Sequence, residues 1–468
     1  MSRVMIEMNE LIDEISMGPF GSDIKVDNFV EMGVPVLNGS NVNGVRLTEE
    51  SFNYVTPEKA KSLKKANVKR GDIVITHRGT LGQIAFIPEN SLYDNYVISQ
   101  SQFKVTLKPK LVDPAYFTYY FHTNEGQKRL LSFKNHVGVP ALAQATSNFR
   151  KLEFPLIPLF EQKKIAKVLS NLDAKIELNN KINIELEAMA KTLYDYWFVQ
   201  FDFPDANGKP YKSSGGKMIW NAELKREIPE GWEVNSLSSW INNDKSGDWG
   251  KEHEEGNYNQ KVYCVRGADI NGLNGKGELK TPERYILEKN LYKTLDPHDL
   301  IVEISGGSPV QSTGRLAYIT EETLQRFDAP IICSNFCKAV TLKNKYYFFN
   351  FVLQWNSIYD AGVLFGYEGK TSGIKNLLFE SFVSSHYTAI PPIELSEKFY
   401  DFMKPIQIKK EKNLKENQEL ASLRDWLLPM LMNGQVSVAS TCSANKDGYE
   451  VEDNELGMVA ERGVEYKK

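Results

Sequence analysis

The chain has 468 residues, of which 41% are hydrophobic, and a formal net charge of -4 at pH 7. This length and composition predict an ordinary globular protein of two or three domains, and nothing in them suggests disorder before about the last thirty residues. The first residues lack a signal-peptide pattern and the most apolar run, 346–355, is too short to span a bilayer, so we expect a cytoplasmic protein. The four cysteines show no paired spacing, which argues against a zinc site or a disulfide framework.

Residues 1–158 are predicted to form a mixed α/β domain. Short apolar strands alternate with turn-forming clusters, as where 34–37 stops at Asn38 and where 73–76 stops at His77. Further strands are expected over 84–87 and 103–107, and an aromatic helix over 115–122. The domain ends at Pro155 and Pro158.

A long helix is predicted next, over 159–203. Apolar residues recur at alternating spacings of four and three from Ile165 to Trp197, over more than four heptads, and this pattern is typical of a coiled coil. Asn179 and Asn183 also fall on this seam. A core asparagine costs stability but fixes the register, because any slip leaves its amide against hydrocarbon.

The same seam recurs 234 residues later, from Phe399 to Leu431, with Asn413 and Asn417 at the matching positions. If the two helices are antiparallel, the pairs are Asn179 with Asn417, Asn183 with Asn413, Trp197 with Phe399, and Leu169 with Leu427. The asparagines and the apolar residues therefore agree on one register.

Two charged residues, Lys410 and Arg424, lie on the second seam. We expect their heads to extend outward along the side-chain stem toward solvent. The alternative to the coiled coil is two separate amphipathic helices, each packed on its own domain.

Residues 204–230 are rich in Gly, Ser and Lys and are predicted to be a surface linker. The pattern of the first domain then returns: 34–44 is echoed by 262–272, 71–74 by 298–301, and Ser101-Gln102-Phe103 by Ser334-Asn335-Phe336. A period above 200 residues is too long for a solenoid and indicates a duplicated domain-plus-helix unit. We expect the second domain over 231–392, the second helix over 393–434, and a polar, disordered tail over 435–468.

Several segments carry a family resemblance. They are PLIPL at 155–159 leading into EQKKIA at 161–166, the WF end of the first helix with its KPYKSSGGKM linker, LRDWLLP at 423–429, and GPFGSD at 18–23. Together they resemble the specificity (S) subunits of type I restriction-modification enzymes over nearly the whole chain. The second helical region departs from the first by beginning ELSE at 394–397.

The resemblance implies an α+β fold: two duplicated mixed α/β target-recognition domains separated by two long helices that form an intramolecular antiparallel coiled coil. It implies a non-catalytic, DNA-binding subunit of a phage-defence system, in which each domain reads one half of a bipartite double-stranded DNA target. The helices would set the gap and dock two methyltransferase (M) subunits and, through them, restriction (R) subunits. No cofactor is expected in this chain, whereas S-adenosylmethionine, ATP and Mg are expected on the partners.

The charge balance is unusual for a DNA-binding protein, which is commonly strongly basic. Residues 1–160 hold 18 Lys and Arg against 16 Asp and Glu, and residues 230–393 hold 16 against 20. A basic surface for DNA must therefore be local. Polar residues at strand ends are the candidates for DNA contact: Ser22, Lys25, Asn38, Asn41, His77 and Arg78 in the first domain, and Arg266, Ser308, Gln311, Arg315, Lys370, Thr371 and Lys375 in the second.

Signals of catalysis are weak. The Asp/Asn-Pro-Pro-Tyr/Phe motif of adenine methyltransferases is absent, and Gly369-Lys370-Thr371 lacks the first glycine of a phosphate loop. Asp205, Glu223 and Lys225 fit the loose spacing of a metal-dependent nuclease but fall in the linker. Two alternatives stay open: an enzyme with an unrecognised site, which would show metal- or S-adenosylmethionine-dependent activity, and a coiled-coil adaptor that binds only proteins.

Overall fold

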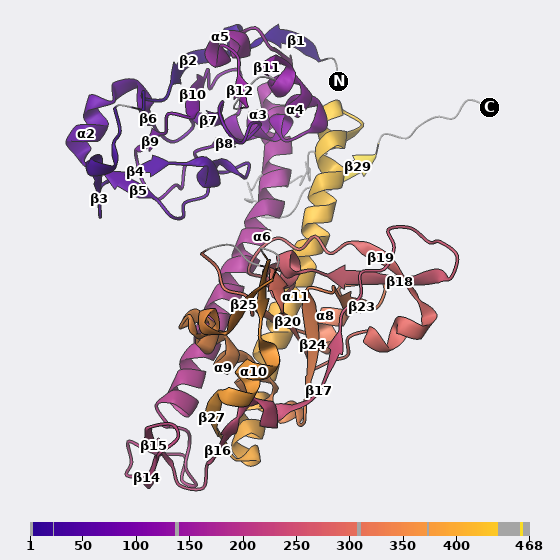
Figure 1. The fold of residues 1–468 in the computed structure, drawn as a ribbon. Helices are drawn as coiled ribbons and strands as arrows, with labels where there is room; N and C mark the ends of the chain where they lie inside the picture. The colour runs from indigo at the N-terminus through magenta and orange to yellow at the C-terminus, as the bar shows by residue number, and fades with distance from the viewer. Residues whose placement is uncertain are drawn as a thin grey trace, which may run out of the picture. The chain divides into compact units, whose positions relative to one another are not determined.

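The computed structural model describes residues 3–21, 23–135, 140–306, 310–371, 374–438 and 459–461. The chain divides into two compact units (Figure 1). Unit 1 comprises Met1–Lys175 with Leu420–Lys468, and unit 2 comprises Ile176–Glu419. Each boundary falls within a long helix.

Unit 1 contains two main sheets. The first is antiparallel, in the order β2 (Ile12–Met17), β10 (Gln102–Leu107), β7 (Ile73–Thr76) and β8 (Ile84–Phe86). The second has the order β3 (Phe29–Val30), β5 (Asn53–Val55), β4 (Val34–Leu37), β9 (Tyr96–Ile98) and β6 (Asn67–Val68), and in it β4 and β9 are parallel.

Shorter elements complete unit 1. Three strand pairs are β1 (Val4–Glu7) with β13 (Glu153–Leu156), β11 (Lys134–Asn135) with β12 (Ala141–Leu142), and β28 (Val436–Val438) with β29 (Val459–Glu461). The short helices are α1 (Met8–Leu11), α2 (Pro57–Ser62), α3 (Pro114–Phe121), α4 (Asn124–Leu130) and α5 (Ala145–Arg150).

The core of unit 1 is aromatic and centred on α3. This helix starts where Asp113 accepts a hydrogen bond from the Tyr116 amide at 2.9 Å, with Pro114 at the first position. Phe117 stacks on Phe154 with 5.0 Å between ring centroids. Apolar residues of both long helices within this unit join the same core: Ile165, Leu169, Leu172, Leu427 and Leu431.

Unit 2 repeats this plan. Its antiparallel sheet has the order β17 (Ile241–Ser246), β24 (Cys337–Leu342), β20 (Asp299–Glu303) and β22 (Leu316–Tyr318), and a second sheet has the order β19 (Glu283–Leu287), β18 (Tyr258–Val265) and β23 (Ile331–Cys333), with β18 and β23 parallel. A third sheet joins β21 (Ser305–Gly306), β26 (Ile374–Leu377) and β25 (Glu368–Thr371).

The remaining elements of unit 2 are two strand pairs and four short helices. The pairs are β14 (Met218–Asn221) with β15 (Arg226–Pro229), in what the sequence predicts as a linker, and β16 (Glu233–Ser236) with β27 (Tyr387–Ile390). The helices are α7 (Ile270–Leu273), α8 (Glu321–Leu324), α9 (Phe348–Asp360) and α10 (Phe379–Ser385).

The sheet registers correct one sequence echo. Thr76 pairs with Gln102 in unit 1, whereas Glu303, at the same end of the matching strand, pairs with Cys337 in unit 2. Gln102 therefore corresponds to Cys337, and Ser334 corresponds to Ser99. The predicted match of Ser101 with Ser334 is out of step by two residues, because both loops contain serine and only the hydrogen-bonded register distinguishes them.

The two long helices are α6 (Leu159–Tyr194), which passes into a π-helical turn over Asp195–Val199, and α11 (Ile393–Asn433). α11 ends before Gly434, whose φ of 74° is the left-handed conformation that commonly terminates helices. Within each unit α6 and α11 lie side by side (Figure 1). The predicted α+β class, with a duplicated domain and two long paired helices, is confirmed.

Candidate nucleic-acid interface

In unit 1 the ends of four strands converge into one group of loops, which we call loop cluster 1: residues 18–21, 23–25, 38–43, 77–83 and 99–101. The Gly18 amide donates to the Gln102 carbonyl and the His77 amide to the Ser101 carbonyl, each at 2.8 Å. Gln102 Nε2 donates to the Asn38 carbonyl at 3.1 Å. These cross-loop bonds fix polar loops from distant parts of the sequence next to one another.

Three of the predicted residues in loop cluster 1 stand directly after a strand: Asn38 after β4, and His77 and Arg78 after β7. Asn38 Oδ1 accepts the Ser40 amide at 2.8 Å, and burial lowers the pKa of His77, whose Nε2 lies 3.2 Å from the Gln100 carbonyl. Arg78 is exposed, and its guanidinium makes no ion pair with any residue that the structure describes. Arg78 borders a concavity of about 690 Å³ that β12 and the start of α5 also line.

The other predicted residues of the first domain differ in placement. Asn41 is fully buried, and its amide donates to the carbonyls of Thr48 at 2.9 Å and Glu50 at 2.8 Å, so its side chain shapes the loop. Lys25 is exposed. Ser22 lies outside the described residues.

Several exposed residues around Arg78 were missed by the sequence reading. Gln100 lies in the loop between β9 and β10, and Gln144 and Ser147 border the same concavity as Arg78. Gln144 has a φ of 42°, a left-handed backbone that is unfavourable for this residue type. Their amides and hydroxyl are donors and acceptors suited to base edges, but they do not follow a predicted strand, which was the signal used.

Unit 2 has a matching group, loop cluster 2: residues 247–250, 266–269, 304–306, 310–315 and 334–336. The Ser334 amide donates to the Val265 carbonyl and the Ile304 amide to the Phe336 carbonyl, both at 2.9 Å. The Leu377 amide, on β26, donates to the Ile304 carbonyl at 2.9 Å and attaches the hairpin of β25 and β26 to this cluster. Asn335 and Phe336 are exposed here and were also missed.

The three predicted cations of unit 2 whose side chains are described, two in loop cluster 2 and one on β26, are all paired. Arg266 Nε donates to Asp269 at 2.7 Å, Arg315 binds both oxygens of Glu303 at 2.9 and 2.6 Å, and Lys375 lies 3.0 Å from Glu368. The hydrogen bond from Arg315 to Glu303 raises the pKa of the guanidinium. Gln311 is exposed, Ser308 lies outside the described residues, and so do the side chains of Lys370 and Thr371.

The predicted asparagine pairs are present in unit 2. Asn179 Nδ2 donates to Asn417 Oδ1 at 3.0 Å, and Asn413 Nδ2 donates to Asn183 Oδ1 at 2.8 Å. Asn183 Nδ2 also donates to the Lys410 carbonyl at 3.3 Å, and Trp197 packs on Phe399 with 5.8 Å between ring centroids. These contacts confirm the antiparallel pairing, while the role of the asparagines in fixing the register stays a prediction.

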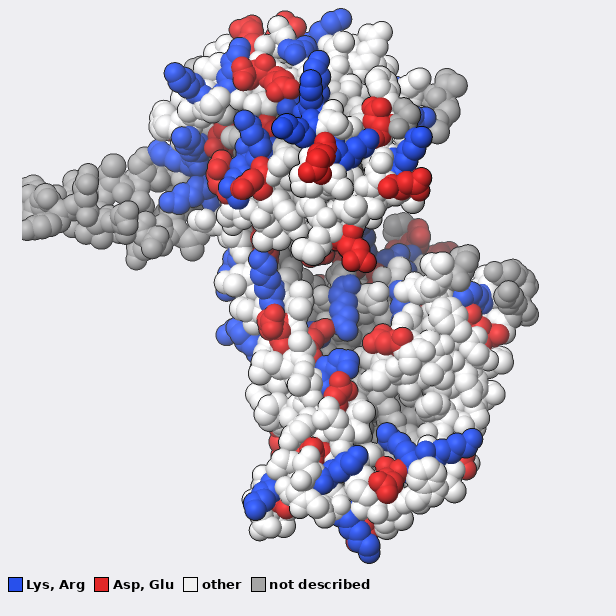
Figure 2. Space-filling model, turned by 90° about the vertical axis from the view of Figure 1, so that its left-hand side faces the viewer, with Lys and Arg blue, Asp and Glu red and all other residues white. Residues whose placement is uncertain are grey.

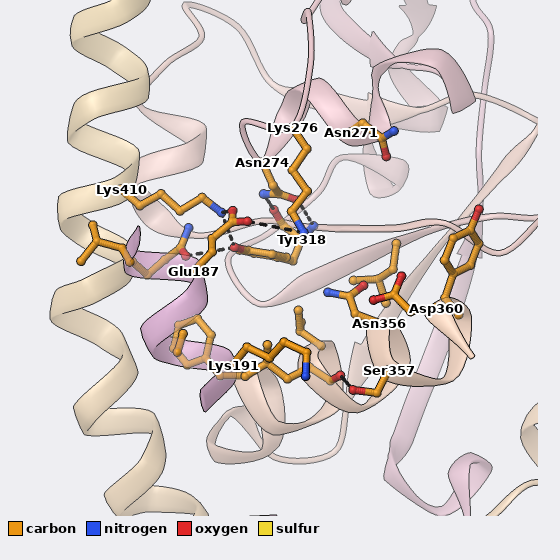
Figure 3. Close-up of a pocket in the computed structure, with 18 of the residues that line it drawn as sticks. Glu187, Lys191, Asn271, Asn274, Lys276, Tyr318, Asn356, Ser357, Asp360 and Lys410 are labelled. Atoms are coloured by element: carbon orange, nitrogen blue, oxygen red, sulfur yellow. Dashed lines mark hydrogen bonds and ion pairs between the residues drawn. The ribbon is translucent and has the colours of Figure 1, made fainter. Parts of the chain in front are cut away.

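The expectation that Lys410 extends to solvent is wrong. Its side chain is only 4% exposed, and its ammonium group pairs with Glu187 of α6 and lies 3.1 Å from the Tyr318 hydroxyl (Figure 3). Burial alone would lower the pKa of Lys410, but Tyr318 and Glu187 together raise it. The ammonium is stabilised inside because two elements far apart in the sequence supply oxygen atoms.

This network forms one wall of a cavity of about 440 Å³ in unit 2. α6, α9, α11 and β22 contribute to its lining, and Figure 3 shows Asn271, Asn356 and Asp360 away from the Lys410 network. The other charged residue of the second seam, Arg424, lies in unit 1, where it donates to Asp173 at 2.7 Å with its side chain 30% exposed. Asp173 also accepts a hydrogen bond from the Tyr119 hydroxyl.

The proposed nuclease spacing has no matching geometry. Asp205 accepts the backbone amides of Asn207 at 2.8 Å and Lys209 at 2.9 Å, which makes it a local turn residue. Within the described ranges, no group of three or more His, Cys, Asp or Glu side chains is arranged to hold a metal ion. No helix in these ranges is long and apolar enough to cross a membrane.

Comparison with known proteins finds a family model and several relatives that resemble this chain. Residues 23–188 match the model of the type I restriction modification DNA specificity domain. The type I restriction enzyme MjaIX specificity subunit of Methanocaldococcus jannaschii is 27% identical over 81% of this chain and 81% of its own length. The HindI specificity subunit of Haemophilus influenzae is 31% identical over 34% of each chain.

One solved structure supports the fold. The crystal structure of the type I restriction-modification S subunit from M. genitalium aligns with 92% of this chain and 96% of its own, with a TM-score of 0.54 and 16% sequence identity. At this identity the likeness concerns the fold.

Proposed function

The chain belongs to the family of type I restriction-modification specificity subunits, the non-catalytic subunits that give these systems their DNA specificity, and we propose that loop clusters 1 and 2 each read one half of a bipartite DNA target. The observation that carries the proposal is the duplication itself. The same strand ends gather loops in both units, but the exposed side chains differ. A scaffold built twice with different loops is suited to two unlike half-sites.

The chemistry of each cluster supports direct reading of bases. Arginine forms two hydrogen bonds with guanine and glutamine or asparagine with adenine in the major groove. Loop cluster 1 presents Arg78 and Gln100, and Gln144 borders the same concavity, while loop cluster 2 presents Gln311 and Asn335. Arg266, Arg315 and Lys375 are held by carboxylate partners that offset their charge, so in unit 2 we assign the first role to the neutral amides.

The proposal extends to the two helices. They set the gap between the half-sites and dock two M subunits and, through them, R subunits. S-adenosylmethionine, ATP and Mg belong to those partners. The support is the buried asparagine network, because an amide that must find its partner tolerates one register only.

The test is to co-express the chain with its neighbouring genes and map adenine methylation across the genome by long-read sequencing. We expect a bipartite motif with a fixed gap that disappears when the chain is deleted. Exchanging residues 231–392 for those of a relative should change one half only. A motif unaffected by deletion, or no motif at all, would favour the adaptor that binds only proteins.

A second variant tests the helices. Replacing Asn183 and Asn413 by leucine removes the hydrogen bonds that fix the register but keeps the seam apolar. We expect a folded protein that methylates targets with more than one gap length. An unchanged gap length in the methylation map would show that these asparagines do not determine the spacing between the half-sites.

A further inference from the structure

A run of basic residues in unit 1 is not used by either loop cluster. Residues 59–70 contain six Lys and Arg and no Asp or Glu. Three exposed members, Lys61, Lys64 and Lys65, form what we call the lysine strip, on α2 and the 3-10 turn that follows it. Among the described residues, none of the three has a carboxylate within 4 Å, whereas Arg70, at the end of the run, pairs with Asp94 at 3.0 Å.

The backbone under the lysine strip is held firmly. Thr56 caps α2 by accepting the Lys59 amide at 3.2 Å, and Pro57 occupies the first turn. Asn67 Nδ2 donates to the carbonyls of Ala60 at 2.8 Å and Lys64 at 3.2 Å. The three ammonium groups therefore extend from an ordered segment and keep like charges close together, which is unfavourable unless an anion joins them.

The lysine strip lies beside loop cluster 1. Ser16 Oγ, on edge strand β2, donates to the Lys65 carbonyl at 2.8 Å. Met17, the next residue, borders the concavity shared with His77 and Arg78. Figure 2 views unit 1 from the side that carries α2 and shows basic side chains gathered on this face among acidic ones. A duplex seated on loop cluster 1 would have a backbone strand within reach of the strip.

Unit 2 lacks an equivalent. The matching segment, 287–298, contains Lys289 and Lys293 together with Glu288 and Asp296. Lys293 donates to the Gly247 carbonyl at 2.9 Å and lies 3.7 Å from Asp248, so it is already engaged. The cations of loop cluster 2 are paired as well. The two halves of the protein therefore differ in free positive charge next to their loops.

We propose that the lysine strip binds DNA phosphates beside the half-site of unit 1, and that the sequence-independent, salt-dependent part of DNA affinity enters mainly through this unit. This inference rests on the proposed function. Lysine ammonium groups contact phosphates without distinguishing bases. Unit 1 then supplies the electrostatic attraction for the whole chain, and unit 2 contributes through neutral groups and shape.

The test is the salt dependence of DNA binding by the full chain assembled with its M subunits. The variant is Lys61→Gln with Lys64→Gln and Lys65→Gln, and the probes are duplexes with the mapped target and with a scrambled one. Each lost phosphate contact flattens the slope of log affinity against log salt by about 0.9, so three contacts flatten it by about 2.7. Raising salt from 50 to 200 mM should then weaken the variant about 40-fold less than the unmodified protein.

The control replaces Lys110 and Lys151 by glutamine; both are exposed lysines of unit 1 around the opposite strand ends, and neither lies on a long helix. Lys110 follows β10, and Lys151 precedes Leu152, whose carbonyl accepts the Met8 amide at 2.8 Å. We expect this control variant to show the same slope of log affinity against log salt as the unmodified protein. Lysine-to-arginine changes in the strip should also keep it.

The outcomes separate the inference from the proposed function. A flatter slope on both duplexes with an unchanged methylation motif supports the phosphate role. An unchanged slope with an unchanged methylation motif would show that the lysine strip does not bind phosphates, while the proposed function would still stand. A loss confined to the target duplex would assign these lysines to base recognition instead. No target preference in the unmodified complex would overturn the proposed function itself.

Discussion

The two units share a buried framework down to individual hydrogen bonds. Asp72 and Asp299 occupy the same strand position, and each accepts a threonine hydroxyl from the neighbouring strand at 2.5 Å. Each also accepts a backbone amide three residues earlier, Asp72 from Lys69 at 2.9 Å and Asp299 from Asp296 at 3.0 Å. A charged group fixed by several donors tolerates little change. The shared framework therefore sits where substitution costs most.

The units differ where the framework ends. At one matched pair of strand positions, unit 1 has Thr76 bonded to Gln83 at 3.1 Å, while unit 2 has Glu303 bound by Arg315. Both pairs bridge the same two strands, one with neutral groups and the other with charges. The comparison teaches that the loops can change their polarity without altering the sheet beneath them.

The units also differ in how the domain joins the helices. In unit 2, Arg326 lies 3.2 Å from Glu411 of α11, and the two side chains are 2% and 0% exposed. In unit 1 the nearest polar network is a pair between the two helices, Arg424 with Asp173, which is partly open to solvent and which the domain joins through the Tyr119 hydroxyl. Ala190 stands in unit 2 at the seam position that Arg424 fills in unit 1, and it lines the 440 Å³ cavity.

The largest effect is expected from breaking the buried pair of unit 2. Arg326→Met leaves Glu411 charged without a partner, or forces it to take up a proton, in a buried site. We expect it to lower the free energy of unfolding by about 3–5 kcal/mol. Arg424→Met in unit 1 should lower the free energy of unfolding by about 1 kcal/mol, because its ion pair is partly solvated. Denaturant unfolding followed by hydrogen exchange in each unit measures both.

The control for this prediction is the double variant Arg326→Met with Glu411→Leu. Replacing both charges by apolar groups should restore most of the loss. If Arg326→Met is no more damaging than Arg424→Met, the two junctions are energetically alike and burial does not distinguish them.

The features that could be predicted from the sequence are those that local periodicity encodes. The duplicated strand pattern and the antiparallel asparagine pairs follow from spacings of two to seven residues. The partners of Lys410 do not, because Glu187 and Tyr318 come from elements 223 and 92 residues away in the chain. Because the sequence alone does not show that these oxygen atoms lie near Lys410, it predicted that the ammonium group of a seam lysine must reach solvent.

The candidate site shows the same division. The pairing of Arg266 with Asp269 was visible in the sequence, because Asn38 and Asn41 have the same spacing in the echoed segment. The lysine strip was also visible as a charge run. Its place beside Arg78 was not, since it depends on β2 lying at the sheet edge, paired with a strand some ninety residues later.

A smaller effect is expected from pH, and it should appear in both units. Burial lowers the pKa of His77 and His122 in unit 1 and of His298 and His386 in unit 2 below the ordinary 6.5. Because the folded protein favours the neutral rings, the stability they contribute is complete above pH 6.5 and is lost as the pH falls below it. One histidine changes the slope by at most about 1.4 kcal/mol per pH unit.

His122 allows the pH effect to be assigned to one unit. Its Nε2 lies 2.9 Å from the Ile84 carbonyl, and His122→Gln keeps a donor there without a titrating group. Hydrogen exchange between pH 5 and 7 should then show a weaker pH dependence in unit 1 and an unchanged one in unit 2. Equal changes in both units would mean that His122 is not the source.

The smallest effect tests a position that the two units fill differently. Gly71 and His298 precede the matched aspartates with φ of 84° and 75°, a conformation that suits glycine and strains histidine. His298 Nε2 lies 2.6 Å from the Tyr400 hydroxyl of α11, and its ring meets Phe348 at 5.1 Å between centroids. We expect His298→Gly to be more stable than His298→Ala by about 1 kcal/mol, and Gly71→Ala to cost a similar amount, because both comparisons isolate the backbone strain. Thermal unfolding of the three variants measures this difference.

His298→Gly should nevertheless remain less stable than the unmodified chain, because it loses the contact of His298 with α11, which unit 1 lacks at Gly71. A gain in stability would mean that this contact contributes less free energy than the backbone strain costs.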